Sequence, residues 1–176
     1  MSILSKDALT LKVLSYNNQK GTTSVPLEVK RFLAKLLSFS YGVVIHGKPY
    51  TDFENAYVDL SEYRTLTTTE FQKYQVGICF DFVNYEAKWF MDHEYSFRTF
   101  YLAFSGATNH THTILLFVYH DHVYWLEASW RKYSGIREFD SYNDALRVIG
   151  YLFYKEYSSG YDYVYRFHFS GKDHQA

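Results

Sequence analysis

The stretch of sequence that decides the fold is residues 111–130, THTILLFVYHDHVYWLEASW. It contains two runs of β-branched and aromatic residues, 111–119 and 123–130, and this composition is typical of β-strands. Between the runs stand the polar residues His120 and Asp121. The stretch therefore predicts two antiparallel strands joined by a tight turn.

The length of that turn determines which side chains share a face of the sheet. If the loop consists of His120 and Asp121, the register places His112 opposite Ser129, and Glu127 lies one diagonal step away on the same face. A loop with an even number of residues keeps His112 and Glu127 together, whereas an odd number separates them unless a bulge intervenes. A carboxylate within an apolar strand is rarely buried without a partner. We therefore expect His112 to be the partner of Glu127.

The rest of the chain predicts helices before and after a group of strands. Apolar residues at three- and four-residue spacing indicate helices, and further runs of β-branched and aromatic residues indicate strands. The expected helices cover about residues 26–39, 79–91 and 142–156, with a short helical turn that starts at Thr67–Glu70, and the expected further strands are Val43–His46, Phe100–Phe104, Ile136–Phe139 and Tyr161–Phe169. Because the strands are grouped, we predict an α+β fold in which the helix that begins at Cys79 packs on an antiparallel β-sheet.

The composition fits one domain and argues against several classes of partner. The chain has 176 residues and no Gly/Ser-rich linker, so we expect a single domain over residues 1–176, with a core at about 66–169 and an N-terminal helical extension at about 1–65. Lys and Arg number 18 against 19 Asp and Glu, without a basic run, so no nucleic-acid partner is expected. Neither a secretory signal nor a membrane-spanning apolar stretch is present, so we expect no membrane contact and a cytoplasmic location.

The chemistry of the chain is expected to centre on Cys79, its only cysteine. A single cysteine excludes an internal disulfide and leaves either a buried inert thiol or a reactive one. Cys79 lies in the first turn of a predicted helix, and Gly77 permits a tight entry into that helix. The free amides of a helix N-terminus lower the pKa of a thiol and can hold an oxyanion. These features favour a reactive thiol, with His112 as base and Glu127 as the group that orients the imidazole.

Two segments resemble transglutaminase-like and papain-like cysteine proteins. Residues 77–83, GICFDFV, resemble the Gly-x-Cys helix entry of these proteins. His112 together with residues 124–130, YWLEASW, resembles their His strand and acidic strand. The likeness is strongest to small bacterial or phage-type members and covers about residues 66–139.

This resemblance implies a fold and a set of roles. It implies a papain-like or transglutaminase-like core, with Cys79 as nucleophile, His112 as general base and Glu127 as orienting acid. The substrate would be a protein or peptide, with a glutamine side chain among the amides that could react, and the chemistry would need no cofactor. The wider family usually has Asp in the third place, so Glu127 departs from its pattern by one methylene group.

Other histidines offer alternative sites. His110 lies two residues before His112 on the same strand face and is a minor alternative as the base, whereas His93 lies too far along its helix to reach the cysteine. The pairs His110/His112 and His120/His122 could also place imidazoles for zinc. Because the second pair spans the predicted turn, we expect no metal site.

The sequence leaves open both the second donor of the oxyanion hole and the type of reaction. Beside the backbone N–H of Cys79, the second donor could be Gln75 or Gln72, four and seven residues before the cysteine. The reaction could be that of a peptidase, an amidase, a deamidase or a transglutaminase, because water or an amine can resolve an acyl-enzyme. A catalytically inactive binding or structural protein that retains the fold is the alternative. The pattern predicts no particular oligomeric state.

Overall fold

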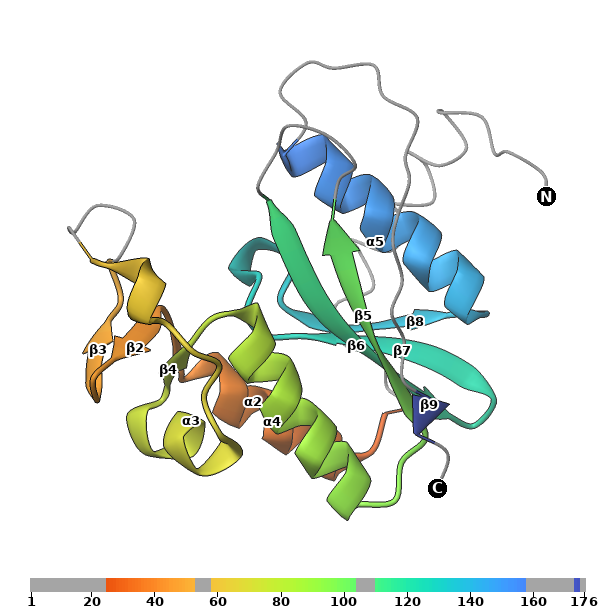
Figure 1. Cartoon of the computed structure of the whole chain (residues 1–176). Helices are drawn as coiled ribbons and strands as arrows, with labels where there is room; N and C mark the ends of the chain where they lie inside the picture. Colours follow the sequence, from red (N-terminus) through yellow and green to blue (C-terminus); the bar gives the residue numbers. More distant parts are fainter. Residues whose placement is uncertain (1–24, 53–57, 104–109, 158–172, 175–176) are drawn as a thin grey trace.

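A computed structural model of the chain describes residues 25–52, 58–103, 110–157 and 173–174, which form a mixed α+β fold (Figure 1). Its centre is a five-stranded antiparallel sheet with the strand order β8-β7-β6-β5-β9. The strands are β5 (Phe97–Ala103), β6 (Thr111–Tyr119), β7 (His122–Glu127), β8 (Gly135–Phe139) and β9 (Asp173–His174). The predicted class, helices packed on an antiparallel sheet, is confirmed.

Three long helices cover the two faces of this sheet. α2 (Leu27–Leu37) and α4 (Cys79–Asp92) lie on one face, and α5 (Tyr142–Tyr157) lies on the other (Figure 1). The smaller elements are β1 (Ser40–Tyr41), β2 (Val43–Ile45), β3 (Lys48–Tyr50), the 3-10 helix η1 (Leu60–Glu62), α3 (Thr68–Tyr74), β4 (Val76–Gly77) and the 3-10 helix η2 (Arg131–Tyr133). The three predicted long helices are confirmed. In the part of the chain described here, no helix combines the length and the apolar character needed to cross a membrane.

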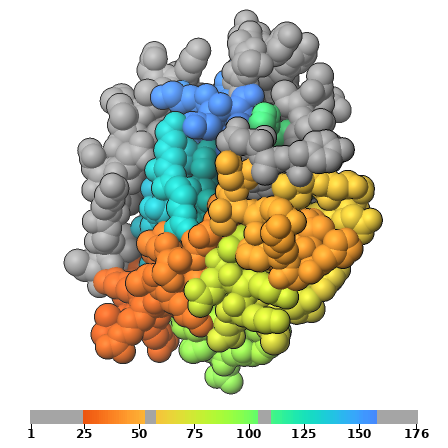
Figure 2. Space-filling model, turned by 90° about the vertical axis from the view of Figure 1, so that its left-hand side faces the viewer, coloured from red at the N-terminus to blue at the C-terminus, as the bar shows by residue number. Residues whose placement is uncertain are grey.

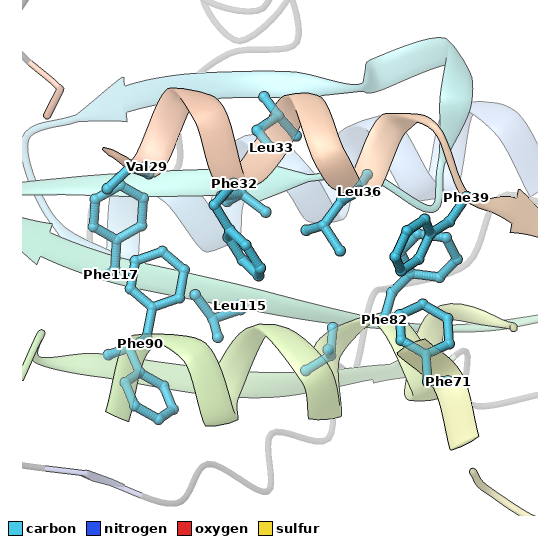
Figure 3. Packing of buried hydrophobic residues seen from close by; sticks show 14 of the residues in the cluster. Val29, Phe32, Leu33, Leu36, Phe39, Phe71, Phe82, Phe90, Leu115 and Phe117 are labelled. Carbon is cyan, nitrogen blue, oxygen red and sulfur yellow. The ribbon is translucent and has the colours of Figure 1, made fainter. Parts of the chain in front are cut away.

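Alternation along β6 produces a core on each side of the sheet. Leu115 and Phe117 face α2 and α4, where Phe117 packs 4.7 Å from Phe90, measured between ring centroids (Figure 3). Ile114 and Leu116 face α5 instead, because successive side chains of a strand point to opposite faces. The strand is therefore buried on both sides, which explains why its sequence is almost continuously apolar.

α2 belongs to the first of these cores. Its apolar face contributes Val29, Phe32, Leu33 and Leu36 (Figure 3). The guanidinium of Arg131, just after β7, donates to the backbone carbonyls of Leu37, at 3.0 Å, and of Phe39. Figure 2 shows this first segment, red to orange, against both the yellow-green segment of α3 and α4 and the cyan segment of the C-terminal half. The described part of residues 1–65 thus shares its core with the segment that carries the motifs.

The hairpin between β6 and β7 has the predicted two-residue turn. His120 and Asp121 both have positive φ angles, 48° and 63°, which is the conformation of a type I′ turn. Tyr119 pairs with His122 and Leu115 with Leu126, as the predicted register requires. The pairing between β6 and β7 ends at Leu115 and Leu126. His112 and Ser129 therefore lie beyond the paired part of β7, although they are at the positions that would face each other if the same register continued.

Two strand boundaries differ from the prediction. β7 ends at Glu127 and not at Trp130, because the side chain of Glu127 accepts hydrogen bonds from the following turn and draws the chain out of the sheet. β5 begins at Phe97, three residues earlier than predicted, since Phe97 pairs with Phe117. The expected strand Tyr161–Phe169 lies outside the described residues, as does the expected end of β5 at Phe104.

Candidate active site

The start of α4 is held by the side chain of Asp81, the third residue of the helix. Its Oδ2 accepts the backbone N–H of Ile78 at 2.9 Å, and its Oδ1 accepts the backbone N–H of Leu66 at 2.7 Å. The hydroxyl of Tyr63 donates to the same carboxylate at 3.1 Å. Burial raises the pKa of Asp81, and these three hydrogen bonds oppose that effect. Asp81 therefore ties the entry of the Cys79 helix to the loop before α3.

Gly77 is required at this entry because there is no room for a side chain. A Cβ atom on Gly77 would lie 2.6 Å from Cβ of Asp81 and 2.7 Å from Cε2 of Phe71, both closer than real contacts allow. Gly77 lies in β4, and its backbone also pairs with Tyr41 of the parallel strand β1. The predicted tight entry is confirmed, and its cause is close packing rather than an unusual backbone angle.

Cys79 is the first residue of α4, and its side chain is buried. The first hydrogen bonds of the helix come from the amides of Asp81 and Phe82, which donate to the carbonyl of Ile78. Among the described residues, the N–H of Cys79 has no acceptor. A free amide beside the sulfur, at the positive end of a helix, is the arrangement that stabilises an anion.

His112 and Glu127 form a buried ion pair on the neighbouring strands. Nε2 of His112 lies 2.9 Å from Oε2 of Glu127, and their side chains are 9% and 3% exposed. Glu127 occupies the diagonal position that the hairpin register predicts. The extra methylene group of Glu, compared with Asp, does not prevent the contact.

The second oxygen of Glu127 is also satisfied. Oε1 accepts the hydroxyl of Ser129 at 2.9 Å and the backbone N–H of Trp130 at 2.7 Å. Burial raises the pKa of Glu127, but the charge of His112 and the hydrogen bonds from His112, Trp130 and Ser129 outweigh it and leave the pKa below its ordinary value. Glu127 is therefore an ionised carboxylate in a fixed orientation.

The structure brings Cys79 to the same imidazole. Burial alone would lower the pKa of His112, yet the charge of Glu127, together with hydrogen bonding and charge interactions with Cys79 and Glu127, raises it to about 10. Because Nε2 is bonded to Glu127, Nδ1 is the ring nitrogen left to face the sulfur. The three residues that the sequence predicts as a triad thus converge in space.

Aromatic side chains surround this centre. Trp130 contacts His112 edge-on at 5.2 Å, and Phe153 of α5 lies 6.4 Å from the same ring, measured between centroids. Trp130 is half-buried, whereas His112 is buried. Tyr63 lies on the cysteine side, close enough for the charge of Cys79 to contribute to its raised pKa, for which burial and Asp81 are the larger causes. The centre is thus largely walled off from water.

The other candidates from the sequence do not join this centre. Gln72 and Gln75 are exposed, and neither side chain makes a hydrogen bond to the cysteine or the imidazole among the described residues. Gln75 instead ends α3 with a φ angle of 54°. His110 is exposed and stacks on Tyr157, with 4.7 Å between the ring centroids, and His93 stacks on its own helix. The expectation that one Gln supplies the second oxyanion donor gains no support from these positions.

The two histidines at the hairpin tip, His120 and His122, lie apart from this centre. Within the described ranges, no group of three or more His, Cys, Asp or Glu side chains is arranged to hold a metal ion. Nδ1 of His122 lies 3.2 Å from Oε1 of Glu138, and His120 occupies the turn. Both are therefore part of the hairpin tip.

Two carboxyl groups near the centre were not found by sequence reasoning. Asp81 at the third position of a helix is a recognisable signal, but it escapes the usual capping pattern because the N-cap is Ile78. Glu86 has no local signal, since its burial depends on how α4 packs against β6.

Comparison with models of known families, with curated proteins and with solved structures finds no match to this chain.

Proposed function

We propose that this protein is a cysteine-dependent enzyme that cleaves or transfers acyl groups at amide bonds, with Cys79, His112 and Glu127 as its catalytic triad. The observation that carries the proposal is the buried His112–Glu127 pair at 2.9 Å, whose imidazole also interacts with a cysteine at a helix N-terminus. A nucleophile, a base and an orienting group within reach of one another define this class of site. A cysteine placed only for packing would need neither the imidazole nor the carboxylate.

The geometry supports a balanced sequence of steps. Nδ1 of His112 takes the proton of the Cys79 thiol, and the thiolate attacks the amide carbonyl, whose oxygen becomes an anion near the N–H of Cys79. The C–N bond then breaks as His112 gives its proton to the leaving nitrogen, which leaves a thioester on Cys79. Water or an amine then attacks the thioester, passes a proton through His112 and releases the thiolate. Glu127 holds the imidazole and balances its charge throughout.

The arrangement of elements supports the papain-like or transglutaminase-like interpretation. A helix that begins with the nucleophile packs on an antiparallel sheet, and adjacent strands of that sheet supply the base and the acid. The substrate we propose is a protein or peptide amide, which includes a glutamine side chain. Hydrolysis and transamidation use the same three residues, and they differ in which nucleophile reaches the thioester.

The proposal is tested by the reactivity of Cys79 and by turnover. Iodoacetamide should alkylate Cys79 well below pH 7 in the wild-type protein, and His112→Ala should abolish this reactivity at low pH, because the imidazolium that stabilises the thiolate is lost. A panel of peptide amides, with and without an added primary amine, should then give an acyl-enzyme detectable by mass spectrometry in the wild type and none in Cys79→Ala. A thiol that reacts only after denaturation would refute the proposal and favour a binding or structural protein.

A further inference from the structure

Arg137 is a buried cation on the face of the sheet that also carries His112 and Glu127. In the register of β7 and β8, Arg137 lies opposite Trp125, and Gly135 lies opposite Glu127. Alternation therefore places Arg137 diagonally next to Glu127 on the face covered by α5, where Trp125 belongs to the core. Arg137 is only 6% exposed. A guanidinium stays protonated even there, so a full positive charge is buried on this face.

The guanidinium of Arg137 extends from its own position in β8 toward the position of Glu127. Its Nη1 donates to the backbone carbonyl of Tyr133, four residues earlier in the chain. A Cβ atom on Gly135, the residue opposite Glu127, would lie 3.9 Å from the same nitrogen. Because the Cβ atoms of opposite residues are about 4.5–5.5 Å apart, Nη1 lies within about 9 Å of Cβ of Glu127. Gly135 brings no side chain of its own into the space between them.

The direct contacts of Arg137 do not neutralise its charge. Its Cζ lies 5.1 Å from the ring centroid of Trp125, and its hydrogen bond goes to the neutral carbonyl of Tyr133. Among the described residues, no carboxylate lies within ion-pair distance of it. Burial lowers the pKa of Arg137, and the charge of Glu127 is the first of the causes that oppose this effect. Glu127 is thus the carboxylate nearest to this cation in the register and the one whose charge acts on it.

Other titratable groups on this side of the sheet are paired elsewhere or lie toward the far end of α5. Lys132 of η2 pairs with Glu156 of α5. Asp144 and Arg147 lie nine and six residues before Phe153, the residue of α5 that contacts His112. The groups on the remaining elements are Arg98, which lies over Tyr142, His110, which stacks on Tyr157, and Glu86 and Glu138, which belong to the opposite face.

Without Arg137 the proposed centre would hold one net negative charge. In the ion-pair state the thiolate of Cys79 and the carboxylate of Glu127 are negative, and the imidazolium of His112 is positive. With a thiol and a neutral imidazole the sum is the same, because Glu127 is ionised in both states. A net charge is costly to bury where the dielectric constant is low. The guanidinium of Arg137 brings the sum to zero in both states.

We propose that Arg137 is a positioning residue of the active site, whose buried guanidinium balances the negative charge of Glu127 and of the Cys79 thiolate. This inference rests on the proposed function. A positive charge at this place favours the thiolate and disfavours the imidazolium. Arg137 therefore keeps more thiolate available at low pH, and it limits how strongly His112 retains the proton that the leaving nitrogen must receive.

The test is Arg137→Met in the full-length protein, which removes the charge and keeps an unbranched side chain. We expect two midpoints to rise: the acidic limb of Cys79 alkylation by iodoacetamide, and the titration of His112 followed by NMR and assigned with His112→Ala. Each should rise by some tenths of a pH unit to about one, the size expected for charges roughly 10 Å apart at an effective dielectric constant of about 20. Disturbed packing would instead admit water and move the two midpoints in opposite directions, because the ion pair itself would weaken.

Three variants control for other causes. Arg98→Met removes a guanidinium that also lies over an aromatic ring on this face, but near Tyr142, about 16 Å along α5 from Phe153, and should leave both midpoints unchanged. Arg137→Lys keeps the positive charge and should preserve the acidic limb of the alkylation profile. Arg137→Gln removes the charge but keeps a donor for the carbonyl of Tyr133, so it should reproduce the upward shifts, and it decides the matter if Arg137→Met does not fold.

The inference is overturned if a folded neutral variant leaves both midpoints at their wild-type positions or moves them in opposite directions. An equal shift of the acidic limb in Arg137→Lys would also overturn it, because the charge would then not be the cause. If the wild-type thiol never reacts at low pH, the proposed function fails, whereas the His112 titration in Arg137→Met still decides whether the guanidinium acts on the buried pair.

Discussion

The substitution Glu127→Gln tests the centre most directly, because it removes one charge and preserves the shape of the side chain. In the wild type the pKa of His112 rises from 6.5 to about 10, and the charge of Glu127 is the largest of the causes that raise it. That change corresponds to a preference of about 5 kcal/mol for the protonated ring. The amide of Gln cannot supply this preference, so we expect the pKa of His112 to fall by several units.

Loss of the imidazolium is also expected to change the reactivity of Cys79. Without the imidazolium, the thiolate that we propose for Cys79 loses the positive charge that stabilises it, so less of it is available to react at pH 6. A thiolate of lower pKa is intrinsically a weaker nucleophile, which offsets part of this difference. We therefore expect the alkylation rate of Cys79 at pH 6 to fall by about 10-fold to 100-fold in the variant.

The assay is the iodoacetamide reaction followed by mass spectrometry across the pH range, with Glu138→Gln as the control for loss of a carboxylate. Removing one partner of a buried ion pair costs about 3–5 kcal/mol, so circular dichroism must show that the variant is folded at the assay temperature. A folded Glu127→Gln protein that is alkylated at pH 6 as fast as the wild type would refute the argument that Glu127 maintains the thiolate.

Three further predictions concern the fold. The pKa of His112 is raised in the folded state, so the contribution of its protonated ring to the free energy of unfolding is complete below about pH 6.5 and is lost as the pH rises to about 10. Urea denaturation should therefore show stability falling by up to about 5 kcal/mol over this range. A flat profile would contradict the ion pair. Gly77→Ala should destabilise the protein by about 1–3 kcal/mol, because the added Cβ would lie 2.6 Å from Cβ of Asp81; an unchanged denaturation midpoint would show that the helix entry can yield. Asp121→Gly should raise the stability by about 0.5–1 kcal/mol by relieving a positive φ angle of 63°, and a lower midpoint would show that the Asp side chain contributes more than the turn geometry costs.

Local chemistry was sufficient to predict the hairpin and with it half of the site. The two-residue turn at His120 and Asp121 determines the register, and the register places His112 and Glu127 on one face before any tertiary contact is considered. The Cys79 helix was predicted from its apolar periodicity, and its entry from Gly77. These features depend on neighbours along the chain, which explains why the sequence reveals them.

The features that sequence reasoning missed depend on packing between distant segments. The burial of Glu86 follows from how α4 lies on β6, and no pattern within α4 distinguishes this residue from a solvated glutamate. The early end of β7 arises because Glu127 bonds to the turn that follows it, whereas the strand composition continues to Trp130. Gln72 and Gln75 are candidates because papain-like proteins use a Gln on this side of the cysteine, but their position in the sequence does not determine the direction of an exposed side chain.

The two hydrogen bonds from Arg131 to the end of α2 join residues that are 94 and 92 positions apart in the chain. During synthesis α2 leaves the ribosome long before Arg131 exists, and the bend that follows Glu127 is joined to the end of α2 only when Arg131 reaches those carbonyls. Contacts of such long range form late and slowly, because the intervening chain must be ordered first. A nascent chain that already carries Cys79 therefore lacks His112 and Glu127 in their final positions, so the reactivity proposed above would arise only once both halves of the polypeptide have met.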